Sequence, residues 1–99
     1  MSGLYPYRDT RPSVDPTAFI APGARIVGDV TLGAGTSVWF NAVIRADSAS
    51  IVIGAGTNIP DCAVLHTDPG EVTRKLQETY LATVRGQVEQ YRDWLEHVN

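Results

Sequence analysis

Four polar side chains in the middle of the chain belong to types that can hold a metal ion or move a proton. Arg45 and Asp47 stand two residues apart, and Asn58 and His66 follow them. Histidine titrates near neutral pH and often ligates metals, while arginine and aspartate form charge-assisted hydrogen bonds. Each also has a purely structural interpretation. Arg45 and Asp47 can form an ordinary surface or interface ion pair, a lone histidine is more often a hydrogen-bonding residue, and asparagine is common in turns.

A six-residue repeat must position these side chains. Aliphatic residues recur at this interval, with one three-residue slip after the sixth: Val14, Ile20, Ile26, Leu32, Val38, Ile44, Ile53, Ile59 and Leu65. Small or β-branched residues recur four positions further on: Ala18, Ala24, Val30, Thr36, Ala42, Thr57 and Ala63. A period of six fits neither an α-helix nor a simple amphipathic strand. It fits a coil of short parallel strands in which three hexapeptides close one triangular rung and the aliphatic side chain points inward.

The repeat predicts an all-β left-handed parallel β-helix of about three rungs over residues 14–70, followed by one long C-terminal α-helix over residues 71–99. The handedness rests on the likeness of the hexapeptide pattern to that of known left-handed β-helices. Residues 1–13 are expected to form an extended lead-in that covers the first rung. The slip near Ser48–Ser50 predicts a small loop at one corner, and Cys62 is expected to be a small core filler at another.

The C-terminal segment changes to a period of three or four residues, which is typical of an amphipathic helix. Some 27 helical residues would span roughly 40 Å, whereas three rungs are only about 14 Å tall at about 4.8 Å per step. We therefore expect the helix to pack on neighbouring subunits of a homo-oligomer. The predicted interface residues are Arg45, Asp47, Leu76, Val84, Val88, Tyr91 and Leu95.

Composition limits the classes of function. The chain has 99 residues, a formal charge of −3 and 43% hydrophobic residues, which indicates a mildly acidic globular protein. Nothing in that balance favours nucleic acid or an anionic membrane surface as a partner. A single cysteine cannot form an intrachain disulfide, no apolar run approaches the roughly 20 residues of a membrane span, and no secretory signal pattern is visible. The expected location is the cytoplasm.

Three stretches resemble the γ-class carbonic anhydrase family: residues 26–30, residues 37–47 and residues 57–66. That family consists of left-handed β-helix homotrimers with a C-terminal helix and with zinc, iron or cobalt at the subunit interfaces. The resemblance implies that Arg45 and Asp47 are interfacial ion-pair residues of the catalytic site, that Asn58 lies near that site, and that His66 is the first of three metal-binding histidines. The implied reaction is attack of a metal-bound hydroxide on carbon dioxide.

The chain also departs from the family pattern. The family's second and third histidines lie in further rungs, whereas here the chain turns after His66 into what resembles the family's terminal helix. Pro60 stands where the family usually carries a glutamine, and His97 matches no ligand motif. We therefore expect an oligomeric scaffold, most simply a trimer, with absent or very weak catalysis and no stoichiometric metal. Two alternatives stay open: a metal-dependent carbonic anhydrase with a non-standard ligand set, and a hexapeptide-repeat acyltransferase, which shares the coil.

Overall fold

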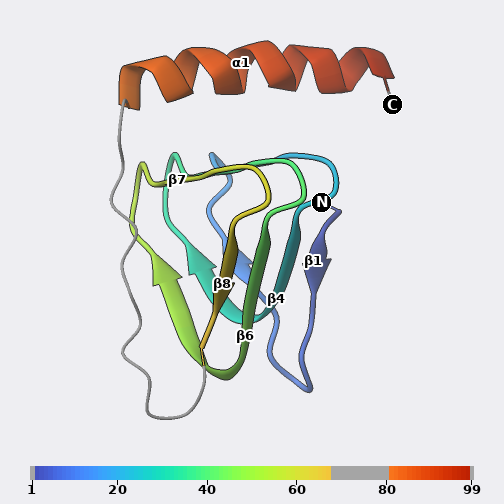
Figure 1. The fold of residues 1–99 in the computed structure, drawn as a ribbon, viewed down its shortest axis with the longest axis vertical. Coiled ribbons are helices and arrows are strands. Elements are labelled where there is room, and N and C mark those ends of the chain that lie inside the picture. Colours follow the sequence, from blue (N-terminus) through green and yellow to red (C-terminus); the bar gives the residue numbers. More distant parts are fainter. Residues whose placement is uncertain (1, 68–80, 99) are drawn as a thin grey trace.

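The structure is a computed structural model that describes residues 2–67 and 81–98. The described strands wind into a coil, and one helix lies beside that coil (Figure 1). In chain order the elements are β1 (Leu4–Tyr5), β2 (Ser13–Val14), β3 (Phe19–Ile20), β4 (Arg25–Leu32), β5 (Ser37–Val38), β6 (Val43–Ile53), β7 (Asn58–Ile59), β8 (Val64–His66) and α1 (Leu81–Val98). No helix among the described residues combines the length and apolarity of a membrane span.

All pairings between the named strands are parallel, as a coil requires. One sheet has the order β1-β4-β6-β8, with β2 pairing the later part of β4, and a second has the order β3-β5-β7. Because β4 and β6 are long enough to turn a corner, each contributes to two sides of the coil. We name two outer faces of the coil. The charged side is the outer face of β1, β4, β6 and β8 near residues 25–28, 43–47 and 64–66. The aromatic side is the outer face of β3, β5 and β7.

The core is a stack of the predicted aliphatic residues. Leu4, Ile26, Ile44 and Leu65 occupy matching positions of four successive strands. Ile26 and Ile44 are fully buried, whereas Leu4 and Leu65 at the two ends of the row are only partly buried. Full burial of one such side chain contributes roughly 1.5–3 kcal/mol. The sequence prediction of a parallel-strand solenoid of about three turns followed by one helix is therefore confirmed.

The lead-in is part of the coil rather than a cover for it. Leu4 and Tyr5 pair in parallel with Ile26 and Val27 of β4. The solenoid thus begins ten residues before the boundary expected at Val14. The six-residue pattern does not reveal this strand, because the connection from β1 to β2 is longer than one hexapeptide and takes Leu4 out of the six-residue register.

The three-residue slip is accommodated within a strand and not in a corner loop as expected. In the pairing of β4 with β6, Gly28 lies opposite Ala46 and Val30 lies opposite Ile51, so Asp29 faces the whole of residues 47–50. The extra residues are held from both neighbouring rungs. The Ser50 hydroxyl donates to the Asp29 carboxylate, and the Thr67 hydroxyl donates to the Ala49 carbonyl at 3.0 Å.

One column of corner residues has left-handed backbone. Gly23, Asn41 and Cys62 have φ values of 84°, 61° and 61° and occupy equivalent corners of successive rungs. A Cβ on Gly23 would collide with the end of the Asn41 side chain, so a larger residue at this corner would displace that side chain. Cys62 is exposed. The expectation that its thiol fills the core is therefore wrong, because the column turns its side chains outward.

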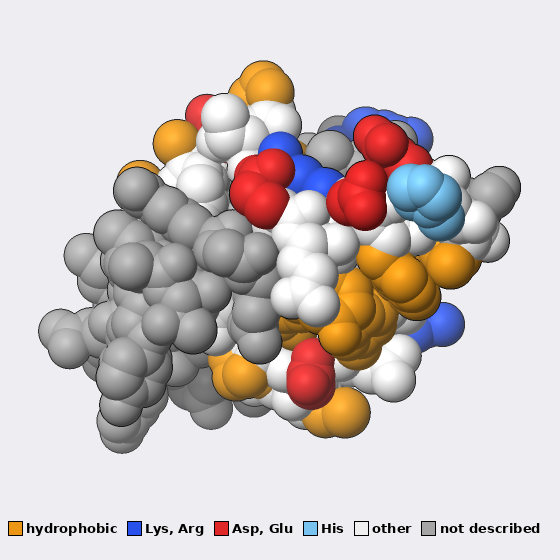
Figure 2. All heavy atoms as spheres, turned by 90° about the horizontal axis from the view of Figure 1, so that it is seen from above, with side chains coloured by type: hydrophobic (Ala, Val, Ile, Leu, Met, Phe, Trp, Pro, Cys, Tyr) orange, Lys and Arg blue, Asp and Glu red, His pale blue; other side chains and the backbone are white. Residues whose placement is uncertain are grey.

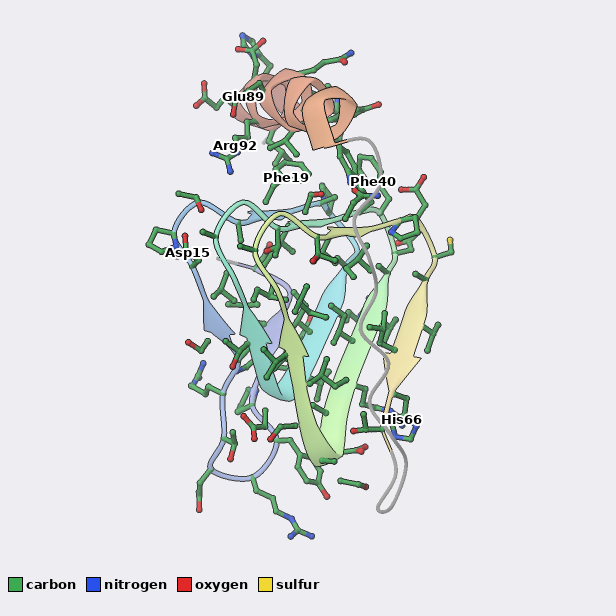
Figure 3. The ribbon with its side chains drawn as sticks, turned by 90° about the vertical axis from the view of Figure 1, so that its left-hand side faces the viewer. Asp15, Phe19, Phe40, His66, Glu89 and Arg92 are labelled. Atoms are coloured by element: carbon green, nitrogen blue, oxygen red, sulfur yellow. The ribbon has the colours of Figure 1, made fainter. Side chains whose placement is uncertain are left out.

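The helix covers the aromatic side of the coil. Figure 1 shows α1 above β7, and Figure 3 shows the helix nearly end-on above the coil. Val88, Tyr91 and Leu95 pack against a buried cluster of Phe19, Ala21 and Trp39 in the same chain. These three residues, which were predicted to face neighbouring subunits, thus contact the coil of their own chain, whereas Trp94 and Val98 of the same helix are exposed. Leu76 lies outside the described residues, as does the side chain of Val84.

Candidate functional site

The structure brings three of the four candidate residues together on the charged side. Arg45 and His66 are direct partners in the pairing of β6 with β8. Asp47 lies on the same face as Arg45, because side chains two residues apart in a strand point the same way. Its two carboxylate oxygens have different partners: Oδ2 lies 3.7 Å from Arg45 Nε, and Oδ1 lies 3.2 Å from His66 Nε2.

Electrostatics favour the charged form of Asp47. Partial removal of water raises the pKa of its carboxyl, but the hydrogen bond with His66 and the positive charges of Arg45 and His66 together outweigh that effect. The pKa of Asp47 therefore lies below its ordinary value. The cluster remains open to solvent, since the side chains of Arg45, His66 and Asp47 are 51%, 27% and 21% exposed.

Next to Asp47 the inserted residues form one wall of a shallow hollow of about 310 Å³. Its other wall comes from the connection that follows β1, and the lining is mostly hydroxyl and charged side chains: Tyr7, Arg8, Thr10, Asp29, Ala46, Asp47, Ser48, Ala49 and Ser50. The sequence shows the slip in the repeat but not this hollow, because the opposite wall lies about 40 positions earlier in the chain.

Asn58 is not part of this cluster. It belongs to β7 on the aromatic side, where its side-chain oxygen accepts hydrogen bonds from Ser37 Oγ at 2.9 Å and Trp39 Nε1 at 2.5 Å. Figure 3 places His66 at the opposite end of the coil's cross-section from α1 and Phe40. In this chain Asn58 therefore fixes the Trp39 ring, and it does not line a common site with Asp47.

The described residues of one chain do not form a complete catalytic metal site. Such zinc sites ordinarily use three protein ligands and one open position. In the part of the chain that the structure describes, no three histidine, cysteine or acidic side chains converge as metal ligands. Nε2 of His66 contacts Asp47, and Nδ1 of His97 lies 2.8 Å from the Asp93 carbonyl on α1.

The structure also contains an aromatic cluster that was not predicted from the sequence, formed by Phe19, Trp39, Phe40, Tyr91 and Trp94. Neighbouring rings in this group have centroids 5.2–6.1 Å apart. A sequence signal existed, since Trp39 and Phe40 directly follow an inward aliphatic residue, where the repeat itself requires no aromatic group. Their partners on α1 lie some 50 residues later, and the repeat gives no information about that pairing.

Comparison with known proteins shows which proteins the coil resembles. No family model matches the chain. Gamma carbonic anhydrase 3 of Arabidopsis thaliana mitochondria is 44% identical over 73 residues, covering 74% of this chain and 28% of that protein. A carbonic anhydrase of Geobacillus kaustophilus is 48% identical over 66 residues, covering 67% and 36%. The crystal structure of a hexapeptide transferase family protein from Anaplasma phagocytophilum matches with a TM-score of 0.63 and 51% identity, covering 65% and 39%.

The parallel rungs and their inward aliphatic columns define a hexapeptide-repeat β-solenoid protein. Within that class the coil is similar to proteins named γ carbonic anhydrases, as the expected resemblance indicated. It spans less than half the length of each of these relatives.

Proposed function

We propose that this chain is an oligomeric γ-carbonic-anhydrase-like scaffold, most simply a homotrimer, with absent or very weak catalysis. One observation carries the proposal: on the charged side, Asp47 pairs with both Arg45 and His66. This arrangement gives an ordered, solvent-accessible row of opposite charges, which suits recognition of a like surface on a second copy. Charge pairs at interfaces contribute mainly to register and specificity.

The donor set supports the non-catalytic part of the proposal. Asp47 and His66 supply two candidate metal ligands, and the nitrogen of His66 nearest to Asp47 is already within hydrogen-bonding distance of its carboxylate. A metal ion at this position would have to compete for both groups. A neighbouring subunit would also have to supply the remaining ligands.

The alternative function is a metal-dependent carbonic anhydrase with a non-standard ligand set. The high identity to proteins named carbonic anhydrases favours it, and His66 would be its ligand in this chain. A bound zinc, iron or cobalt ion would lower the pKa of a water ligand towards 7. A hexapeptide-repeat acyltransferase is a weaker alternative, supported only by the word transferase in the name of the Anaplasma protein.

One experiment separates these functions. Untagged protein and the variants Arg45→Ala, Asp47→Ala and His66→Ala would be measured by light scattering at micromolar concentration and by elemental analysis. We expect the parent to be an oligomer with no stoichiometric metal. Either Arg45→Ala or Asp47→Ala should reduce the mass, while circular dichroism shows the coil intact.

Asp9→Ala is the matched control, because Asp9 is an exposed acid outside this cluster. If Arg45→Ala and Asp47→Ala keep the parent's mass, the interface role is wrong. About one metal ion per chain, lost in His66→Ala, would favour the enzyme and call for a carbon dioxide hydration assay.

A further inference from the structure

A second hollow, of about 180 Å³, lies where α1 meets the aromatic side. Its lining combines aromatic rings with one carboxylate and one amide: Trp39, Phe40, Asn58, Pro60, Asp61 and Tyr91. Figure 2, seen from the side of α1, shows hydrophobic side chains gathered along one flank of the helix with an acidic side chain close by. The residues proposed for the scaffold interface lie on a different side of the coil.

The aromatic walls are arranged at steep angles to one another. The Tyr91 ring meets Trp39 at 83° and Phe40 at 75°, with both centroid separations at 5.5 Å. Trp94 extends the group on the outer side and is 39% exposed. Aromatic faces carry partial negative charge, so rings set at right angles around a hollow can attract a cation placed between them.

The base of the hollow is fixed by hydrogen bonds. The indole N–H of Trp39 can only donate, so the group of Asn58 that faces it must be the carbonyl oxygen, which also accepts from Ser37. This assigns the amide orientation of Asn58 from chemistry. Trp39 itself is only 6% exposed. A ring held in this way keeps its orientation when a ligand arrives.

Asp61 brings a negative charge to the hollow. Its Oδ1 accepts a hydrogen bond from the Phe40 backbone N–H at 3.2 Å, which ties the carboxylate to the aromatic wall. Among the described side chains, those of residues 2–67 and 88–98, no basic group forms an ion pair with Asp61. Asp61 is exposed, so its carboxylate can contact a ligand at the mouth of the hollow.

We propose that this hollow binds a small organic cation, specifically a quaternary ammonium group, against Phe40 and Tyr91 with Asp61 balancing its charge. Other ligand classes fit less well. An anion would be repelled by Asp61, and calcium would need six or more oxygen ligands where one carboxylate is present. The volume is also below the roughly 300–1,000 Å³ of pockets for drug-sized ligands.

The test uses the chain's own tryptophans. Its only two, Trp39 and Trp94, both belong to the aromatic cluster, so their fluorescence reports on this region. The full chain would be titrated with choline chloride, with 3,3-dimethylbutan-1-ol as the neutral compound of the same shape, and with sodium chloride for ionic strength. We expect a saturable change with choline at millimolar concentration, and no saturable change with the alcohol or the salt.

Two variants locate the binding. Asp61→Asn keeps an oxygen that can accept the Phe40 N–H bond but removes the charge, and we expect it to weaken choline binding about three- to fivefold, as for one unit charge near a surface. Asp9→Asn makes the same charge change in the connection between β1 and β2 and should leave binding unchanged. Equal responses to choline and the alcohol, the absence of saturation, or equal effects of the two variants would each overturn the proposal.

Discussion

The charged side and the aromatic side of this coil share one internal frame and differ in what they present outward. Both place a fully buried aliphatic residue inward, such as Ile44 behind the charged side and Val38 behind the aromatic side. Outward, the charged side carries Arg45 and His66 in solvent, whereas the aromatic side carries Trp39, which α1 covers. The repeat therefore determines the interior, and the outward positions are free to acquire separate roles.

The two sides also differ in how much stability they contribute. Ion pairs in solvent typically contribute 0.2–1 kcal/mol, because water screens them and side-chain entropy opposes them. Aromatic rings bury large areas, and ring pairs add about 0.5–1.5 kcal/mol beyond that burial. We therefore expect substitutions on the aromatic side to change the free energy of unfolding far more than substitutions on the charged side.

The largest expected effect comes from Trp39→Ala. The change removes a nearly buried ring that contacts Phe19, Phe40 and Tyr91 and leaves Asn58 without its indole donor. Large-to-small changes of this kind cost about 3–5 kcal/mol. Urea unfolding followed by circular dichroism measures the loss. Val64→Ala, at a position 70% exposed on β8, is the matched control and should change stability by less than about 0.5 kcal/mol. Equal losses of stability in the two variants would contradict the expected difference between the aromatic side and the charged side.

A smaller effect is expected where α1 is fastened to the coil. Arg92 donates a hydrogen bond to the Thr17 carbonyl at 2.7 Å, and Figure 3 shows its side chain directed from the helix to the coil. Arg92→Ala should weaken the docking of α1 by about 0.5–1.5 kcal/mol, the usual contribution of one hydrogen bond. Hydrogen exchange should then quicken in α1 and stay unchanged in β4 and β6. Glu89→Ala, whose side chain points away from the coil, should leave both rates unchanged.

The smallest effect concerns pH on the charged side. Because the pKa of Asp47 is lowered in the folded chain, its contribution to stability is present above the ordinary carboxyl value of 3.8 and is lost as the pH falls through the lowered value. Asp47→Asn should remove that contribution. By this linkage, the difference in melting temperature between parent and variant should shrink as the pH falls from 5 towards 3. A difference that grows on acidification would contradict the assignment.

The interior of the coil could be predicted because its buried positions recur at a fixed spacing, which is visible in the sequence. Each inward residue from Ile26 to Ile59 must be aliphatic, so the six-residue columns give both the fold and the register. The same pattern also places Arg45 beside His66, since both follow an inward residue in neighbouring rungs. Their shared partner, Asp47, follows from the two-residue period of a strand.

Features that depend on outward positions could not be predicted in the same way. Asn58 was expected near the candidate active site, and only the structure shows that its oxygen accepts from Trp39 on another side. Cys62 was expected inside, because the hexapeptide pattern does not reveal the sign of φ at a corner. The position of α1 could not be predicted either. An amphipathic pattern shows that a helix has an apolar face, but it does not show which surface that face covers.

The placement of α1 over more than one turn has a mechanical consequence. In a solenoid each turn touches only its neighbours, so a pulling force along the axis would peel turns away one at a time. Here a single helix reaches Phe19 on the first turn and Trp39 on the second, and Arg92 adds a bond to Thr17. Trp39 in turn is bonded to Asn58 on the third turn. The helix therefore acts as a clamp across the stack, so under load the turns should part together rather than in sequence.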